Sequence, residues 1–443
     1  MQLAIIGLLT IVVMLALIMT KRLSTLTALI IVPVVGYLVA SILGVITVED
    51  VTLGSLMING IKNIAPTGVM FIFAILFFGI LTDAGTFDPI VKKILSVVGK
   101  DPVKIAIGTV LLAIFVHLDG SGAVTFIIVV PAMLPLYDEL GMKRTVLATC
   151  VALGAGVMNM VPWGGPTLRA ITALNSSVNE VFIPMIPSLI AGIITALLIA
   201  AYLGKKEKQR LHAGIDVVDS VHMEGIEKKQ EVDESLRRPH LFWINIISIF
   251  VVIAIMISEV LPPASAFMLG TVFALLVNYR DQALQRKIID KHAPSALMMA
   301  SMLFAAGSFT GIMNGSGMLT AMAEALVNVI PESLGARFPL ITGILSMPLS
   351  LVFDPDSYYY GVLPVLGSAA SAFGINPVMV ARASIIGQMT TGFPISPLTG
   401  STFLLIGLTG IDLGEHQKST FHWLYLSTIV MLIVALITGA IPL

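Results

Sequence analysis

Residues 117–122, which read His-Leu-Asp-Gly-Ser-Gly, interrupt a long apolar segment of the chain. An ionisable side chain flanked by apolar sequence is costly to bury unless it is paired or hydrated, so Asp119 is predicted to carry chemistry. Glycine lets the backbone turn and approach a ligand closely, and Ser121 and Gly122 are predicted to bind substrate. His117 could also titrate beside them. The structural alternatives are that Asp119 caps the following helix and that His117 is a packed neutral side chain.

A second stretch, residues 159–169, combines helix-breaking residues with an arginine. Its two prolines and two glycines cannot continue a helix, so the chain must unwind and expose backbone carbonyl and N–H groups. Arg169 is a permanent cation suited to a carboxylate, although it could instead snorkel to a membrane interface. The substrate-binding residues predicted in this stretch are Asn159, Pro162, Gly164, Gly165, Thr167 and Arg169.

Residues 354–360 begin with two acids, Asp354 and Asp356, and continue with Ser357 and three tyrosines. Two acids this close cannot both be cheaply ionised in a dry site, so one should hold a proton at neutral pH. The pair is therefore predicted to carry protons, and Ser357 to bind substrate. The alternative is a simple turn in an extracellular loop, which the apolar sequence on both sides disfavours.

The fourth stretch, residues 393–402, is the counterpart of the second, with hydroxyl groups in place of the arginine. The alternative to a binding role is a kinked helix in which serine and threonine hydroxyls refill the hydrogen bonds that the kink frees. The substrate-binding residues predicted here are Ser396, Pro397, Thr399 and Ser401.

The composition indicates that these stretches lie in a membrane protein. The chain has 443 residues, of which 57% are hydrophobic and 12% charged, and its mean hydropathy is +0.98. A soluble protein of this length needs far more charge. The net charge of −1 gives no reason to expect a nucleic-acid partner. The single cysteine, Cys150, excludes an intrachain disulfide and a cysteine-based metal site, and the lack of a Walker A motif argues against an ATP-driven pump.

Apolar runs of about 20 residues, the length that crosses a bilayer, recur from end to end. Regions 103–137 and 338–373 are apolar but split by their acidic residues, so each is predicted to be a re-entrant helical hairpin with a polar tip at membrane depth. Residues 146–175 and 377–408 are predicted to be broken helices. The predicted spans, about ten, are residues 3–19, 26–47, 65–83, 146–160, 180–203, 241–260, 264–278, 295–313, 377–392 and 420–441.

The chain is predicted to consist of two repeats, residues 1–203 and 239–443, joined by a polar linker at 204–238. An alanine–proline pair precedes a glycine at the same interval in both halves, and the acidic tips and later prolines follow in the same order. Five spans and one hairpin per half make the second repeat inverted. Placing the N-terminus outside puts most of the 25 Lys and Arg residues inside, as the positive-inside rule requires. The linker is therefore predicted to be cytoplasmic.

Inverted repeats with broken helices at membrane depth are typical of secondary transporters. The four stretches also resemble the CitMHS family of citrate–divalent metal:proton symporters, which belongs to the ion transporter superfamily. The resemblance covers essentially the whole chain. The segments that carry it are residues 117–122, 159–167, 353–360 and 393–401.

The resemblance implies a carrier, not an enzyme, that takes up citrate as a complex with a divalent cation such as Mg²⁺ or Ca²⁺, driven by proton entry and without another cofactor. It also implies a homodimer in the bacterial cytoplasmic membrane, in which a transport domain slides like an elevator against a fixed scaffold. Asp119, Asp354, Asp356 and His117 would carry protons, and Asp119 or Asp356 would contact the cation. The distantly similar sodium–dicarboxylate carriers have Ser-Asn-Thr tips instead of acids, which argues against sodium coupling here.

Three alternatives remain open. A carrier of the same superfamily for gluconate, lactate or a dicarboxylate would need no divalent cation. An intramembrane aspartyl protease could use Asp119 and Asp354, but the Gly-x-Gly-Asp signature is missing and repeat symmetry has no role there. A channel would lack strict saturation and counterflow.

Overall fold

The computed structural model describes residues 1–46, 52–212, 234–258, 260–327, 335 and 337–442, and its regular elements in these ranges are all helical. The first half contains α1 (Gln2–Met19), α2 (Thr25–Ile42), α3 (Leu53–Asp83), α4 (Asp88–Val98), α5 (Pro102–Val116), α6 (Gly122–Glu139), α7 (Arg144–Met158), α8 (Gly165–Leu174), α9 (Val178–Phe182) and α10 (Ile186–His212). The second half contains α11 (Phe242–Ile257), α12 (Pro263–Asn278), α13 (Gln282–Gly315), α14 (Met318–Val327), α16 (Phe338–Leu349), α17 (Leu363–Ala372), α18 (Pro377–Ile386), α19 (Gly400–Thr409) and α20 (Leu413–Ile437).

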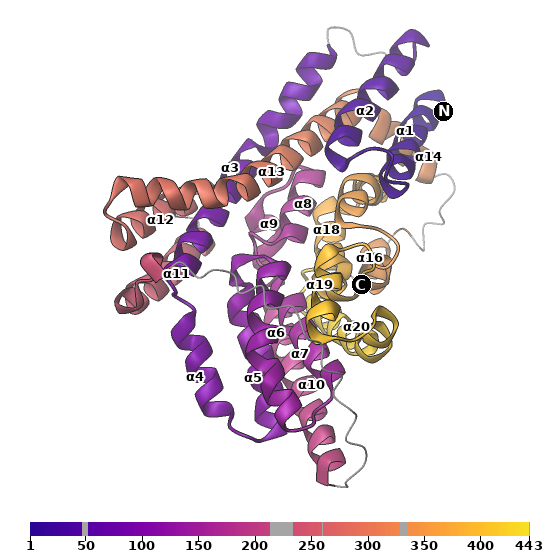
Figure 1. Ribbon diagram of the computed structural model, residues 1–443. Helices are drawn as coiled ribbons and strands as arrows, with labels where there is room; N and C mark the ends of the chain where they lie inside the picture. The colour runs from indigo at the N-terminus through magenta and orange to yellow at the C-terminus, as the bar shows by residue number, and fades with distance from the viewer. Residues whose placement is uncertain (47–51, 213–233, 259, 328–334, 336, 443) are drawn as a thin grey trace.

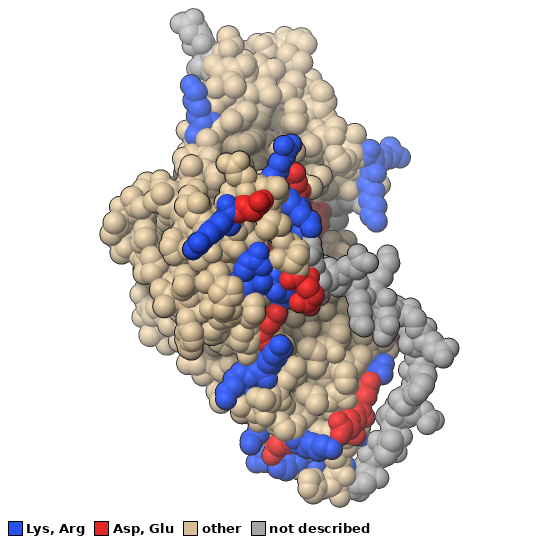
Figure 2. All heavy atoms as spheres, turned by 60° about the vertical axis from the view of Figure 1, so that its left-hand side comes forward, with Lys and Arg blue, Asp and Glu red and all other residues tan. Residues whose placement is uncertain are grey.

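Within the described ranges, eight helical segments are long and apolar enough to cross a membrane, and a ninth results if α18, its following turn and α19 form one span bent by 44°. Four further apolar helices, α1, α7, α12 and α16, are shorter. In Figure 2, charged side chains gather in patches and leave broad uncharged surface between them, as expected where lipid surrounds a protein. The predicted all-helical membrane architecture is confirmed, whereas the count of about ten spans stays a prediction.

The two longest helices, α3 and α13, pack along each other and cross the molecule diagonally (Figure 1). Both begin well before the predicted spans at 65–83 and 295–313, so those predicted starts are wrong. The prolines that were expected to open the spans, Pro66 and Pro294, lie inside the helices instead. Proline is tolerated inside a membrane helix because neighbouring helices and side chains satisfy the freed backbone groups.

Glycines bring the backbones of α3 and α13 into direct contact. A Cβ atom on Gly60 would collide with the carbonyl of Gly307, and one on Gly311 would collide with the carbonyl of Leu56. Small residues at a crossing let two membrane helices approach closely and gain van der Waals contact. The pair therefore forms one continuous wall, called here the α3–α13 wall.

The two regions predicted to be hairpins are each divided by a turn. In the first, α5 and α6 pack against each other and are joined by a 3-10 turn, η1 (His117–Asp119). In the second, a π-helical turn, η5 (Ser357–Val362), leads into α17 after α16 has ended. Because α5 with its turn and α6 are each 18 residues long and apolar enough to cross a membrane by themselves, their re-entrance stays a prediction.

The chain leaves the helical path at both stretches that are rich in proline. Residues 159–164 separate α7 from α8, and η6 (Gly387–Thr391) and η7 (Phe393–Ile395) separate α18 from α19. Met389 within the second break has a φ of 52°, a left-handed conformation that is unusual for a residue with a side chain. Both breaks expose backbone groups in the interior of the protein.

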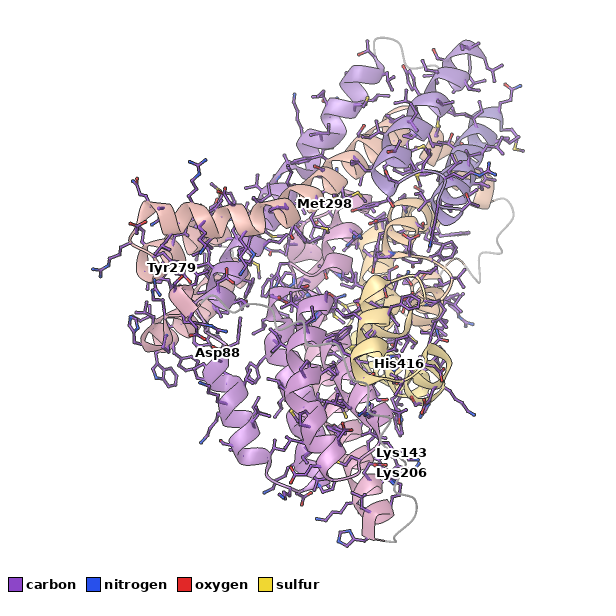
Figure 3. All side chains as sticks on the ribbon, viewed as in Figure 1. Asp88, Lys143, Lys206, Tyr279, Met298 and His416 are labelled. Carbon is purple, nitrogen blue, oxygen red and sulfur yellow. The ribbon has the colours of Figure 1, made fainter. Side chains whose placement is uncertain are left out.

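The predicted linker, residues 204–238, is only partly described. Its first residues continue α10 as far as His212, and residues 213–233 lie outside the described residues. Close to its second end, Arg237 forms an ion pair with Asp88, which begins α4 (Asp88 is labelled in Figure 3). The second end of the linker therefore lies beside the junction of α3 and α4.

Candidate functional site

A cavity of about 460 Å³ lies where both divided regions and both broken helices meet. Its walls come from the η1 turn, the break between α7 and α8, the break between α18 and α19, and the α3–α13 wall. Small-molecule sites usually enclose about 300–1,000 Å³, so the cavity suits a ligand of that kind. The predicted site residues that line it are Asp119, Ser121, Gly122, Asn159, Gly165, Arg169, Thr399 and Ser401.

The other predicted site residues do not line the cavity in the described structure, although His117 and Asp356 form a hydrogen bond and an ion pair, respectively, with residues that do. These residues are His117, Pro162, Gly164, Thr167, Asp354, Asp356, Ser357, Ser396 and Pro397.

The η1 turn presents Asp119 to the cavity. Its Oδ1 atom accepts the backbone N–H of Ser121 at 2.8 Å, and Oδ2 has no hydrogen-bond partner among the described residues. The N-cap of α6 is Ser121, whose hydroxyl accepts the N–H of Val124 at 3.3 Å. Across the turn, the indole of Trp163 donates to the carbonyl of Leu118 at 2.8 Å. The turn is therefore held by Trp163, which belongs to the first break, between α7 and α8. Because Ser121 caps α6, Asp119 is not needed as the helix cap.

His117 connects the turn to both breaks. Its Nδ1 lies 2.8 Å from the Thr125 hydroxyl, and its Nε2 lies 3.3 Å from Oδ1 of Asn159. The amide of Asn159 in turn donates to the carbonyl of Met389 at 2.6 Å, and the His117 ring stacks on Phe393 at 5.7 Å. Through these contacts the fully buried His117 side chain holds the η1 turn and both breaks together. Its proton-coupling role stays a prediction.

Arg169 projects from α8 and joins the first break to the second divided region. Its Nε lies 2.7 Å from Oδ1 of Asp356, and the two side chains are 13% and 17% exposed. Its Nη1 donates to the carbonyl of Gly165 at 3.3 Å, whereas Nη2 has no hydrogen-bond partner among the described residues. Gly165 opens α8 and also lines the cavity, so the positive end of the helix dipole adds to the charge of the arginine. This part of the cavity is suited to an anion.

Asp354 has a different environment from Asp356. Its Oδ1 accepts the backbone N–H groups of Asp356 and Ser357, both at 3.0 Å, and its Oδ2 accepts the Ser357 hydroxyl at 2.5 Å. These bonds fold the chain into the turn that begins η5, as an aspartate at a helix start commonly does. Asp356, in contrast, forms an ion pair with Arg169, which lines the cavity.

Hydroxyl groups in the second break satisfy carbonyls of the break itself and of the neighbouring end of α16. Ser396 donates to the carbonyl of Ser350 at 2.5 Å, and Thr399 donates to the carbonyl of Phe393 at 2.8 Å. This is the behaviour expected of a kink that is rich in hydroxyl groups. Thr399 and Ser401 nevertheless line the cavity as well, so the two interpretations of this stretch are compatible.

Sequence reasoning missed the α3–α13 wall. The wall lines the cavity with the aromatic residues Phe71 and Phe78 and with the polar residues His292 and Ser295. Its helices look like ordinary spans in the sequence, and the histidine lies outside the four stretches that carry motifs. Trp163 of the second stretch, which stacks on Phe78 at 5.0 Å, was the one residue of the four stretches that could have indicated an aromatic partner on this wall. Among the described residues, no group of three or more His, Cys, Asp or Glu side chains converges to hold a metal ion.

Comparison with known proteins gives a consistent result. A family model described as a citrate transporter, CitMHS, matches residues 14–387. A citrate transporter of Bacillus subtilis (strain 168) is 46% identical over 99% of this chain and 100% of the relative's length. A protein of the same organism, named Mg(2+)/citrate complex secondary transporter, is 43% identical over 99% of both chains.

A solved structure supports the fold. The YdaH transporter of Alcanivorax borkumensis superposes with a TM-score of 0.61 and covers 88% of this chain and 87% of its own. The sequence identity is 15%, so this likeness concerns the fold alone.

Proposed function

Because the chain belongs to the CitMHS family of citrate transporters, we propose that it takes up citrate as a complex with a divalent cation such as Mg²⁺ or Ca²⁺, driven by proton entry. The chain is a multi-pass membrane protein of a transporter family, and the family is not one of enzymes. The observation that carries the proposal is the cavity, whose lining presents the carboxylate of Asp119 and the guanidinium of Arg169.

Two groups in the cavity would recognise the two parts of a metal–citrate complex. The guanidinium of Arg169 and the positive end of α8 attract a free carboxylate of citrate. Oδ2 of Asp119, which has no partner among the described residues, is the type of oxygen that Mg²⁺ and Ca²⁺ bind. Ser121, Asn159 and Ser401 add polar contacts around the ligand. The cation is part of the substrate, since it arrives and leaves with citrate.

Proton coupling would follow from the ion pair between Arg169 and Asp356. The Nε–H group that binds Asp356 at 2.7 Å is not available to a substrate carboxylate at the same time. A proton on Asp356 neutralises the acid and frees the arginine, and a bidentate bond to substrate then replaces the pair. Proton and substrate would therefore bind together, which is the requirement for symport.

The elevator mechanism and the homodimer belong to the same proposal. The α3–α13 wall would belong to the fixed scaffold, and the segments that carry the divided regions and broken helices would slide along it. The cavity lies between these two parts, which is where such a motion would carry a ligand. The location would be the bacterial cytoplasmic membrane, with the N-terminus outside and the linker in the cytoplasm.

Uptake of labelled citrate into proteoliposomes tests the proposal. We expect uptake to require a divalent cation, to differ across a panel of Mg²⁺, Ca²⁺, Mn²⁺ and Zn²⁺, and to increase when an inward proton gradient is imposed. Saturation and counterflow would exclude a channel. Uptake that is equally fast in the presence of a chelator would contradict the metal–citrate substrate and support a metal-free carboxylate carrier.

A further inference from the structure

His292 on α13 forms a polar cluster with the end of α3. Its Nε2 lies 3.0 Å from Oδ2 of Asp83, and Nζ of Lys291 lies 2.6 Å from Oδ1 of the same carboxylate. The Asp83 side chain is 10% exposed and that of His292 is 20% exposed. A largely buried carboxylate that receives two charge-assisted bonds is firmly held, so the orientation of the imidazole ring is fixed from its Nε2 side.

The same ring lines the cavity. It lies against Gly79 of α3, where an added Cβ atom would come within 2.7 Å of the ring atoms Nδ1 and Cε1. Glycine at this position therefore makes room for the imidazole. Nδ1 has no hydrogen-bond partner among the described residues, in contrast to Nε2. The ring of this cavity-lining residue therefore combines a fixed orientation with one polar atom that has no partner among the described residues.

The cluster of Asp83, Lys291 and His292 attracts an anion only when the His292 ring is protonated. The negative charge of Asp83 and the positive charge of Lys291 cancel. A neutral His292 therefore leaves the cluster without net charge, whereas a protonated His292 gives it a net positive charge. The other ionisable side chains that line the cavity are Asp119 and Arg169, on the segments that face the wall. A citrate trianion that carries a divalent cation retains a net negative charge, which a second cation in the cavity would attract.

We propose that His292 is a second substrate-binding residue, which donates its Nδ1–H to a carboxylate of the transported anion while its Nε2–H stays on Asp83. The inference rests on the proposed transport of an anionic carboxylate complex. Asp83 is then a positioning residue, which selects the ring orientation and stabilises the imidazolium. The contact comes from the α3–α13 wall, so substrate would bridge the wall and the broken helices.

Two neutral substitutions distinguish the roles of the two ring nitrogens of His292. Glutamine places its amide near the position of Nε2, so His292→Gln keeps a partner for Asp83 and loses the contact in the cavity. Asparagine places its amide near Nδ1, so His292→Asn keeps a neutral donor for the substrate. We expect His292→Gln to raise the KM for magnesium citrate about tenfold with little change in Vmax, the loss expected for one hydrogen bond to a charged group. His292→Asn should give an intermediate KM.

The pH dependence provides the second readout. In the wild type, the proposed charged contact should make KM depend on pH, and both variants should lose that component of the dependence. The matched control is His422→Gln, because His422 is an exposed histidine on α20 outside the cavity lining. It should leave KM and its pH dependence unchanged.

The inference is wrong if His292→Gln folds, transports and retains the wild-type KM at each pH. It is also wrong if both variants lower Vmax or the amount of folded protein at unchanged KM, since that pattern indicates a purely structural histidine. Failure of the proposed function is a separate result, namely citrate uptake by the wild type without a divalent cation. In that case the KM ratio for free citrate still decides the role of His292.

Discussion

At the scale of single residues, the site depends on an ion pair between segments far apart in the sequence. Arg169 and Asp356 lie 187 positions apart, yet their side chains meet at 2.7 Å in a largely buried environment. A buried pair of this kind loses much of its hydration, so removal of one partner leaves the other uncompensated. The pair is therefore well suited to respond to a proton or to a competing carboxylate.

Asp356→Asn tests this response. The amide cannot take up a proton and binds the guanidinium more weakly than a carboxylate does. We expect uptake of magnesium citrate to become insensitive to an inward proton gradient, and KM at alkaline pH to fall severalfold because Arg169 is free. Initial rates in proteoliposomes, with and without the gradient at constant internal pH, measure both effects.

Asp354→Asn is the matched control for that experiment. Asp354 accepts backbone N–H groups at the start of η5, and asparagine can serve equally well at such a position. Proton-driven uptake should persist, with a stability change below about 1 kcal/mol. If Asp356→Asn retains full proton-coupled uptake, the proposed role of Asp356 is wrong.

At the scale of elements, the helix breaks are the part of the fold that the sequence predicts best. Proline and glycine act on their own backbone and on the preceding turn, so a stretch that contains several of them stops a helix whatever surrounds it. The same rule misplaced the starts of α3 and α13, because an isolated proline such as Pro66 can stay inside a helix when other helices satisfy the freed groups. The outcome depends on neighbours, which one sequence does not specify.

Gly164→Ala tests whether the first break needs its tight backbone. A Cβ atom at this position would collide with the carbonyl of Asn159 and lie 2.9 Å from the carbonyl oxygen of Val161. Relief of that contact must move the break, at a cost of roughly 1–3 kcal/mol. We expect a lower Tm in detergent and the loss of most of the uptake.

Gly407→Ala on α19 is the comparison for Gly164→Ala, since an added Cβ atom there meets open space. Alanine within a helix is favoured over glycine by up to about 1 kcal/mol. Tm should be unchanged or slightly higher, and uptake unchanged. Equal stability and uptake in the two variants would show that the break tolerates a side chain at position 164.

At the scale of the whole molecule, the cavity results from contacts between the two halves of the chain. The membrane class and the family resemblance were predicted from sequence, and the family is confirmed by the match over residues 14–387. The α3–α13 wall was not predicted, because His292 and Asp83 lie 209 positions apart and no local pattern indicates that they meet. A site made of distant segments becomes visible only when the packing is known.

The native sequence offers a simple probe of the cavity. Cys150 is the single cysteine and is buried, so a Cys150→Ala background leaves any introduced cysteine as the only thiol. Ser401 lines the cavity from the first turn of α19, directly after the second break. Gln209, an exposed residue near the end of α10, supplies a matched position outside the cavity for Gln209→Cys.

The most direct test of the central claim, that metal–citrate binds in this cavity, is maleimide labelling of Ser401→Cys in the Cys150→Ala background. Mg²⁺ and citrate together should slow labelling, with half-maximal protection near the KM for uptake, whereas either alone should protect far less and Gln209→Cys should be unaffected. Labelling of Ser401→Cys that stays equally fast at saturating magnesium citrate, in protein that still transports it, would contradict the claim.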